Sequence, residues 1–198
     1  MGLIVLGAMV LYGLISVVVV LLAIRHAKKN GKSATRWGWG AALVMYLIPF
    51  WDWLPTVAMH QYYCATESGY WVYKTLEQWK AENPGVAETL VAKKGAPSSR
   101  QGDMQNYTDT YSLNQRFNWV IRKTGPLLLN RWQWEKEIID TKTNEVLVRY
   151  VDFSTGSGFI GGPPRALKFW LQSDHCAGGR EKMYSMDAIV GNLSRLLK

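Results

Sequence analysis

The longest uncharged stretch of the chain does most to limit how it can fold. Leu3 to Ile24, LIVLGAMVLYGLISVVVVLLAI, contains no Asp, Glu, Lys or Arg. As a helix rising 1.5 Å per residue it is about 33 Å long, close to the hydrocarbon thickness of a bilayer. A cleaved signal peptide is the alternative, but its basic residues precede the apolar core, and here they follow it. The stretch predicts a transmembrane helix at about residues 3–24.

A second apolar stretch, WGWGAALVMYLIPFWDWLPTV at residues 37–57, predicts another span. Tryptophan is enriched at the interfaces of a bilayer, and this stretch has two at each end. We therefore expect four interfacial anchors: Trp37, Trp39, Trp51 and Trp53.

Several residues of the second stretch are unusual for a membrane helix. Pro49 and Pro55 weaken helical hydrogen bonding, although neighbouring helices can satisfy the freed carbonyls. Gly38 and Ala42 have the spacing that lets a second helix approach closely, which chance would also explain. Asp52 is the one ionisable residue in this stretch, and a position near the interface explains it without a functional role.

The segment between the two stretches orients them. RHAKKNGKSATR, residues 25–36, has no acidic residue and five basic ones: Arg25, Lys28, Lys29, Lys32 and Arg36. The positive-inside rule places such a loop in the cytoplasm. Binding to nucleic acid or to anionic lipids is the alternative, but topology suffices to explain the charge. We expect a multi-pass protein of the bacterial inner membrane, with residues 60–198 as an extracytoplasmic domain.

The net charge of +8 arises largely in this loop. Without the loop and Asp52, 18 of the 23 basic and 14 of the 15 acidic side chains remain. That balance is typical of an ordinary soluble surface rather than a nucleic-acid-binding stripe, so we expect the lipid bilayer as a partner but no nucleic acid.

Residues 60–198 contain a run of strand patterns with helix patterns before and after it, which predicts an α+β domain. Its expected sheet is antiparallel with about four or five strands, and two or three helices pack against it. Strands are expected at 69–75, 111–123, 128–139, 145–153 and 167–171, with DTKTN as the turn of a hairpin. Helices are expected from Thr75 as a capping-box residue, from Asn83 to Leu90, and over 185–198, while 93–103 is expected to be a loop.

Two segments of this domain resemble a group of uncharacterised bacterial inner-membrane proteins with two spans and an exported C-terminal domain. The segments are YYCATESGYWVYKTLEQWKAENPGVAETL and IIDTKTNEVLVRYVDFSTG, together about a quarter of the chain. The resemblance implies the same layout and implies no activity.

Gly156, Gly158 and Gly161 have the spacing G-x-G-x-x-G after an expected strand. In a dinucleotide-binding fold, helical N–H groups next to the third glycine hold the pyrophosphate. Here Pro163 and Pro164 follow, and proline has no N–H. No βαβ pattern precedes the glycines either, so we expect a glycine-rich bend and no nucleotide or other cofactor.

Ser173, Asp174, His175 and Cys176 are consecutive and raise the question of catalysis. Neighbours in an extended segment point to opposite faces, and no nucleophile signature is present, which favours binding over catalysis. A hydrolase or redox protein that uses His175, Cys176 and Asp174 is the alternative function.

Cys64 and Cys176 are the two cysteines of the chain. In an oxidising compartment they predict a disulfide. A zinc site formed with His60 and His175 is the alternative, although adjacent residues such as His175 and Cys176 rarely bind one metal ion. We expect no metal.

Aromatic side chains make up 13% of the chain, and some could stack on sugars or peptidoglycan. The candidates outside the spans are Tyr62, Tyr63, Tyr70, Trp71, Trp132 and Trp134. The first functional hypothesis is a membrane-anchored interaction or structural module of the cell envelope, with an envelope protein or a second copy as partner.

Overall fold

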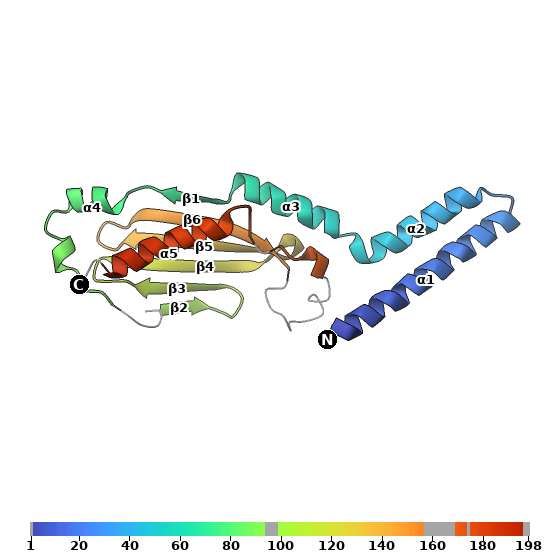
Figure 1. Ribbon diagram of the computed structural model, residues 1–198, viewed down its shortest axis with the longest axis horizontal. Helices are drawn as coiled ribbons and strands as arrows, with labels where there is room; N and C mark the ends of the chain where they lie inside the picture. Colours follow the sequence, from blue (N-terminus) through green and yellow to red (C-terminus); the bar gives the residue numbers. More distant parts are fainter. Residues whose placement is uncertain (1, 94–98, 157–168, 174, 196–198) are drawn as a thin grey trace. The chain divides into compact units, whose positions relative to one another are not determined.

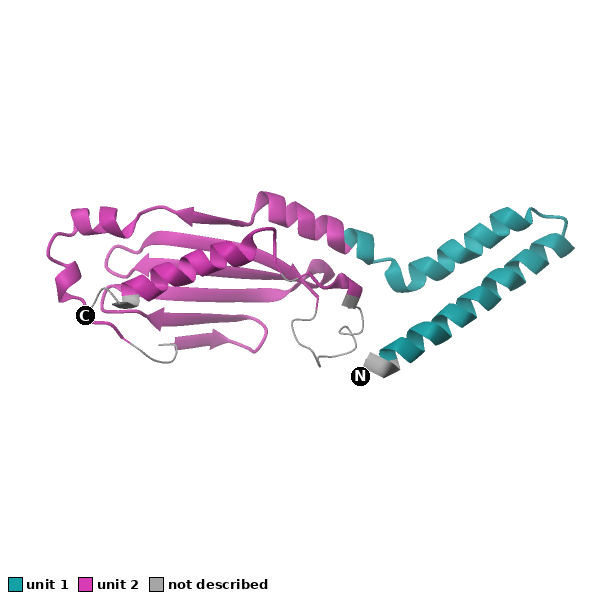
Figure 2. Cartoon of the chain, viewed as in Figure 1, with its two compact units in different colours: residues 1–55 teal, residues 56–198 magenta. Residues whose placement is uncertain are grey.

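The computed structural model describes residues 2–93, 99–156, 169–173 and 175–195. The chain divides into two compact units, residues 1–55 and 56–198 (Figure 2). The division falls inside a helix, α3 (Trp53–Thr66).

The first unit is a helical hairpin of α1 (Gly2–Lys29) and α2 (Ala34–Phe50) (Figure 1). Ser33 begins α2 as its N-cap, and the Ser33 hydroxyl accepts a hydrogen bond from the Arg36 backbone N–H. Gly38 lies against α1, where an added Cβ would be 3.0 Å from Ile24 Cγ1. Gly38 therefore lets the two helices approach closely, as the small-residue spacing predicts.

The second predicted span, 37–57, is not one continuous helix. Helix α2 ends at Phe50, and α3 begins at Trp53 after a bend of 51°. Pro49 has no N–H to donate to the Met45 carbonyl, and the Tyr12 hydroxyl of α1 donates to that carbonyl instead.

Only one helix in the described part of the chain is by itself long and apolar enough to cross a membrane. It covers Val5–Lys29 with a mean hydropathy of 2.8. A second span exists only if the bent pair of α2 and α3 counts as one. The prediction of one apolar N-terminal helix is confirmed, and that of two spans is not.

The second unit is built on a six-stranded antiparallel sheet with the order β1-β6-β5-β4-β3-β2 (Figure 1). The predicted α+β class is confirmed, but the sheet has six strands where about four or five were expected. Segment 93–103, expected to be a loop, contains one of them, Ser99–Gly102. The strands are β1 (Gly69–Val72), β2 (Ser99–Gly102), β3 (Tyr107–Ser112), β4 (Phe117–Leu127), β5 (Arg131–Asp140) and β6 (Glu145–Thr155).

The predicted strand 111–123 is wrong because it runs across a turn. Ser112 ends β3 and Phe117 begins β4, so the chain reverses between them. The Asn114 side-chain oxygen accepts hydrogen bonds from the backbone N–H groups of Arg116 and Phe117. An asparagine that closes a turn in this way needs no Gly or Pro, and the alternating pattern hid the reversal.

The hairpin around DTKTN is present as β5 and β6. Asn144 in its turn has φ 57°, a conformation that asparagine tolerates. Across this hairpin Trp132 lies opposite Ser154 and Trp134 opposite Asp152.

Helix α5 (Gly179–Arg195) lies across one face of the sheet (Figure 1). It begins six residues before the expected start, and residues 196–198 of the expected helix lie outside the described part. Met186 and Leu193 pack on Ile138 and Tyr150 of the sheet. The stripe of apolar residues at helical spacing explains why this face of α5 is buried.

Helix α4 (Leu76–Glu82) closes the same core. Its predicted capping box is confirmed: the Thr75 hydroxyl accepts from the Gln78 N–H, and the Gln78 side chain accepts from the Thr75 N–H. Trp79 is fully buried and donates its indole N–H to Asp140. Arg116 also donates to Asp140, so this buried carboxylate is paired.

Two further predicted elements are wrong. Residues 83–90 form only a short 3₁₀ turn, η1 (Ala87–Thr89), because Gly85 has φ +74° and breaks a helix there. In place of a strand at 167–171, residues Phe169–Leu171 form the 3₁₀ turn η4, and 167 and 168 lie outside the described residues. Pairing with β6 is limited to one bridge between Thr155 and Ser173.

The sheet face opposite α5 carries charged side chains along its central strands. Arg122 on β4 and Arg149 on β6 flank Glu135 and Glu137 on β5, with ion-pair distances of 2.5 to 3.6 Å. Because these cross-strand pairs are partly exposed, they fit a face that meets water.

Candidate functional site

A disulfide joins Cys64 of α3 to Cys176, which lies just before α5. The two Cα atoms are 5.3 Å apart, inside the range that a disulfide requires. Cys176 is buried against Val151 and Phe153 of β6. The predicted disulfide is thus present in the structure, and neither cysteine is a free thiol.

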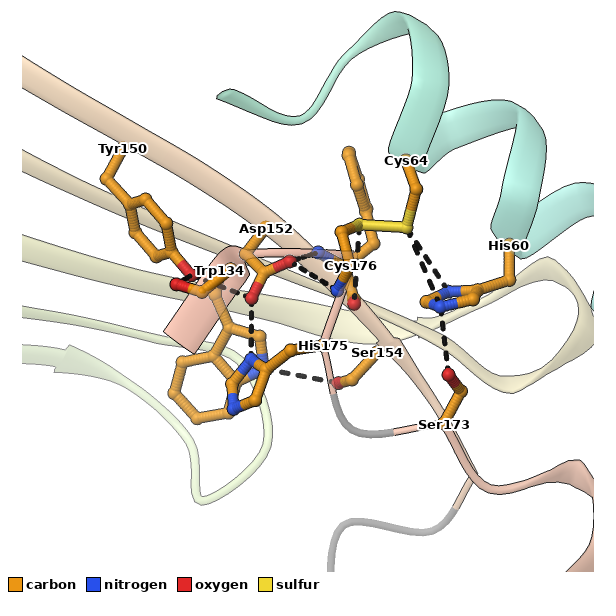
Figure 3. A network of polar contacts seen from close by, with 11 residues as sticks. His60, Cys64, Trp134, Tyr150, Asp152, Ser154, Ser173, His175 and Cys176 are labelled. Atoms are coloured by element: carbon orange, nitrogen blue, oxygen red, sulfur yellow. Dashed lines mark hydrogen bonds and ion pairs between the residues drawn. A yellow bond between two sulfur atoms is a disulfide. The ribbon is translucent and has the colours of Figure 1, made fainter. Parts of the chain in front are cut away.

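Asp152 of β6 lies at the centre of a polar network beside this disulfide (Figure 3). Its carboxylate is fully buried and accepts hydrogen bonds from the N–H groups of Phe153 (2.9 Å) and Cys176 (3.0 Å). It also lies 2.7 Å from the Tyr150 hydroxyl and 2.6 Å from His175 Nδ1. Four donors around one carboxylate compensate for the loss of water around it.

Tyr150 acts as a hydrogen-bond donor in this network. Burial raises the pKa of its hydroxyl, and the hydrogen bond to Asp152 raises that pKa further. The hydroxyl therefore keeps its proton, which it directs at Asp152 or at the Gly179 carbonyl, 2.9 Å away. The network is fixed to the start of α5 through this contact.

Gly179 is required at the start of α5 because Asp152 lies so close. An added Cβ would be 2.9 Å from the Asp152 carboxylate. Negative charge is favourable at a helix N-terminus, so the carboxylate and the helix stabilise each other.

His175 is partly exposed and lies between Asp152 and an open pocket of about 310 Å³. The pocket is lined by His175, Cys176, Gly178, Gly179, Arg180 and Glu181. Figure 3 shows that the second ring nitrogen of His175 points away from Asp152. With Nδ1–H donated to Asp152, a neutral His175 has a free lone pair on Nε2, as a general base needs.

The structure changes the roles expected for the consecutive residues 173–176. The carboxylate partner of His175 is Asp152, and the predicted Asp174 lies outside the described residues. Cys176 cannot act as a thiol nucleophile while it is in the disulfide. Sequence reasoning missed Asp152, whose signal was an acidic residue in the same alternating series as the core residues Val148 and Tyr150 of β6.

His60 lies on the other side of the disulfide. It is one turn before Cys64 on α3, buried, and its Nε2 is 2.9 Å from the Ser173 hydroxyl. The donor atoms of His60, Cys64 and Cys176 all lie within 4.8 Å of one another. Of the four residues considered for zinc, the structure therefore brings three together, while His175 is held by Asp152.

Of the three glycines in the G-x-G-x-x-G motif, one lies in the described part of the chain. Gly156 has φ +99° and directly follows β6, while Gly158 and Gly161 lie outside the described residues. The strand before the motif belongs to an antiparallel hairpin rather than a βαβ unit, which gives no support to a dinucleotide site.

The aromatic candidates differ in exposure. Tyr62 and Trp71 are exposed, whereas Trp132 is buried and donates its indole N–H to the Gly156 carbonyl. The Lys123 ammonium lies 4.4 Å from the ring centre of Trp132 and 4.9 Å from that of Trp134. Burial lowers the pKa of Lys123, which sequence reasoning did not single out.

Comparison with protein-family models, with curated proteins and with solved structures found no match to this chain. The resemblance to two-span bacterial membrane proteins stays a prediction.

Proposed function

We propose that the protein is a membrane-anchored, extracytoplasmic interaction or structural module of the bacterial cell envelope. In this proposal α1 is one span and the bent pair of α2 and α3 provides a second. The basic loop 25–36 lies in the cytoplasm, and residues from about 60 onward lie outside it. The observation that carries the proposal is the disulfide between Cys64 and Cys176, because disulfides persist in exported domains and are rare in the cytosol.

The exposed side chains of the first unit support anchoring in a bilayer. Leu6, Leu11 and Leu14 of α1 are each about 60% exposed, which is unfavourable in water. The four tryptophans predicted as interfacial anchors are also exposed: Trp37 and Trp39 near the start of α2, and Trp51 and Trp53 at the bend between α2 and α3. The five basic residues of the loop give the orientation: Arg25, Lys28, Lys29, Lys32 and Arg36.

The two edges of the sheet support a binding role because they differ in chemistry. Strand β1 forms one edge, and Trp71, Val72 and the following Tyr73 are exposed there. Strand β2, with sequence Ser-Arg-Gln-Gly, forms the other edge and is exposed but polar. An exposed apolar edge pairs readily with a strand of another chain, so β1 is the proposed contact for an envelope protein or a second copy.

Site-specific photo-crosslinking in cells tests this role. A photoreactive residue at Trp71 is expected to give a discrete adduct, and one at Gln101 on β2 is the matched control. The adduct mass distinguishes an envelope protein from a second copy. Equal labelling from both edges, or no adduct at Trp71, would contradict the proposed contact.

A second candidate function is an extracytoplasmic hydrolase, and the Asp152–His175 pair favours it. A buried carboxylate that orients a histidine next to an open pocket is the arrangement of a general base. Assays of the purified chain on ester and phosphate-ester substrates test this function. Turnover that is lost in His175→Gln and kept in His26→Gln would favour the hydrolase over the binding module.

A further inference from the structure

His60, Cys64 and Cys176 bring together the types of donor atom that soft metal ions prefer. His60 and Cys64 are four residues apart on α3 and so share one face of the helix. Cys176 reaches the same point from the segment before α5. The three donor atoms lie within 4.8 Å of one another, and His60 and Cys176 are buried (Figure 3).

The separation of His60 and Cys64 fits a tetrahedral centre. A zinc ion about 2.3 Å from sulfur and about 2.05 Å from nitrogen sets these two ligand atoms about 3.6 Å apart. Cys64 Sγ is 3.8 Å from His60 Nδ1 and 3.6 Å from Nε2. His60 and the first sulfur therefore already have the separation of two zinc ligands. The sulfur–sulfur bond has to open, and the imidazole has to turn its Nδ1 toward the metal ion, because both ring nitrogens are now about equally far from Cys64 Sγ.

Ser173 already occupies the position of an outer-shell partner. Its hydroxyl is 2.9 Å from His60 Nε2, and its backbone is held by β6 through the bridge to Thr155. A histidine that binds metal through one ring nitrogen usually donates the N–H of the other to such a group. With Nε2–H donated to Ser173, Nδ1 carries a free lone pair that can bind a metal ion.

We propose that reduction of the Cys64–Cys176 disulfide creates a binding site for a soft divalent cation of the Zn²⁺ class, with His60 Nδ1 and the two thiolates as ligands. The site is absent in the oxidised form because disulfide sulfurs carry no thiolate charge. The proposal does not depend on the function proposed above.

The reaction balances with a dithiol as reductant. A dithiol gives two electrons and two protons to the disulfide and becomes a disulfide itself, and Cys64 and Cys176 become thiols. The cation then replaces both thiol protons, which are released to solvent. Three protein ligands leave a fourth position for water. In vitro, a phosphine can replace the dithiol as reductant. It takes the oxygen of one water molecule and becomes a phosphine oxide, and the two hydrogens of that water end on the two thiols.

Cobalt(II) is the probe for the test, because thiolate binding to Co²⁺ gives a near-ultraviolet charge-transfer absorption. The full chain in detergent is titrated with Co²⁺ under anaerobic conditions, with and without the phosphine. We expect absorption that saturates at one Co²⁺ per chain in the reduced form, is absent from the oxidised form and is displaced by Zn²⁺.

Variants separate the proposed site from binding by thiols alone. His60→Ala is expected to weaken Co²⁺ binding by more than about tenfold, since even outer-shell changes cost that much. His26→Ala removes a histidine elsewhere and is the matched control with unchanged affinity. Re-formation of the disulfide on oxidation, read by intact mass, shows that the His60→Ala chain still folds.

Three results would overturn the proposal. One is a reduced wild-type chain with two alkylatable thiols and no charge-transfer absorption. The second is equal Co²⁺ affinity in wild type and His60→Ala. The third is loss of binding in His175→Ala but not in His60→Ala, which would assign the histidine ligand to the other side of the disulfide.

Discussion

The two units of the chain bury their apolar side chains in opposite ways. In α1, Leu6 and Leu14 are more than 60% exposed, while in the sheet of the second unit Phe117 and Ile138 have no exposed surface. Similar residue types therefore have opposite environments in one chain. The second unit encloses its own core, whereas the first leaves its apolar side chains exposed, as the proposed membrane anchor would.

The largest effect is expected from removing the disulfide, which acts on the second unit alone. Replacing Cys64 and Cys176 by Ser frees a loop of 112 residues, and the chain-entropy account gives a loss of about 4 to 5 kcal/mol in unfolding free energy. Urea unfolding followed by tryptophan fluorescence measures this loss. An unchanged urea midpoint would mean that the stability of the sheet does not depend on the disulfide. Membrane association of the first unit is expected to stay the same in this variant.

Breaking the buried charge pair of the second unit comes next. Asp140→Ala leaves Arg116 buried without its carboxylate, so we expect a loss of about 3 to 5 kcal/mol. Asp187→Ala is the matched control, because the Asp187 carboxylate is exposed and its loss should cost less than about 0.5 kcal/mol. If the two variants unfold at the same urea concentration, the buried network has little effect on stability.

The Asp140 carboxylate is also expected to make the unfolding free energy depend on pH. Burial alone would raise the Asp140 pKa, but hydrogen bonds from Arg116, Trp79 and the Lys142 N–H lower it below its usual value. Its contribution to stability is therefore complete at neutral pH and is lost as pH falls below about 4 and through the folded-state pKa. The stability difference between wild type and Asp140→Asn, measured by urea unfolding, should shrink over that range. A difference that grows on acidification would contradict this sign.

A charged substitution in α1 sharpens the contrast between the two units. Leu14→Arg should disfavour membrane insertion by about 3 kcal/mol if α1 is surrounded by lipid. Tyr184→Arg, at an equally exposed position of α5, should be neutral within about 0.5 kcal/mol of unfolding free energy. Membrane fractionation measures the insertion of Leu14→Arg, and urea unfolding measures the stability of Tyr184→Arg. Normal insertion of Leu14→Arg would show that α1 is not lipid-exposed.

The sequence predicted those elements that are determined by a few adjacent residues. The hairpin around DTKTN and the capping box at Thr75 depend on a few adjacent residues, and both are present. The strand 111–123 was wrong because Leu113 and Phe117 continue an apolar pattern across a turn that Asn114 closes. The expected helix over 83–90 was wrong because the backbone conformation of Gly85 cannot be read from a cap pattern.

The candidate site was predicted less well than the fold. The Cys64–Cys176 pairing followed from there being only two cysteines. The partner of His175, however, is Asp152, which is 23 residues away and reaches it only because β6 runs under the start of α5. Contacts of this kind depend on sheet topology, which local patterns do not contain.

The extracytoplasmic location of the second unit can be tested most directly with reporter fusions. Alkaline phosphatase, which is active only after export, is fused after Lys198, with a fusion after Asn30 in the basic loop as control. We expect alkaline phosphatase to be active when it is fused after Lys198 and inactive when it is fused after Asn30. An inactive fusion after Lys198, with a bright fluorescent protein at the same position, would contradict the extracytoplasmic location and the role built on it.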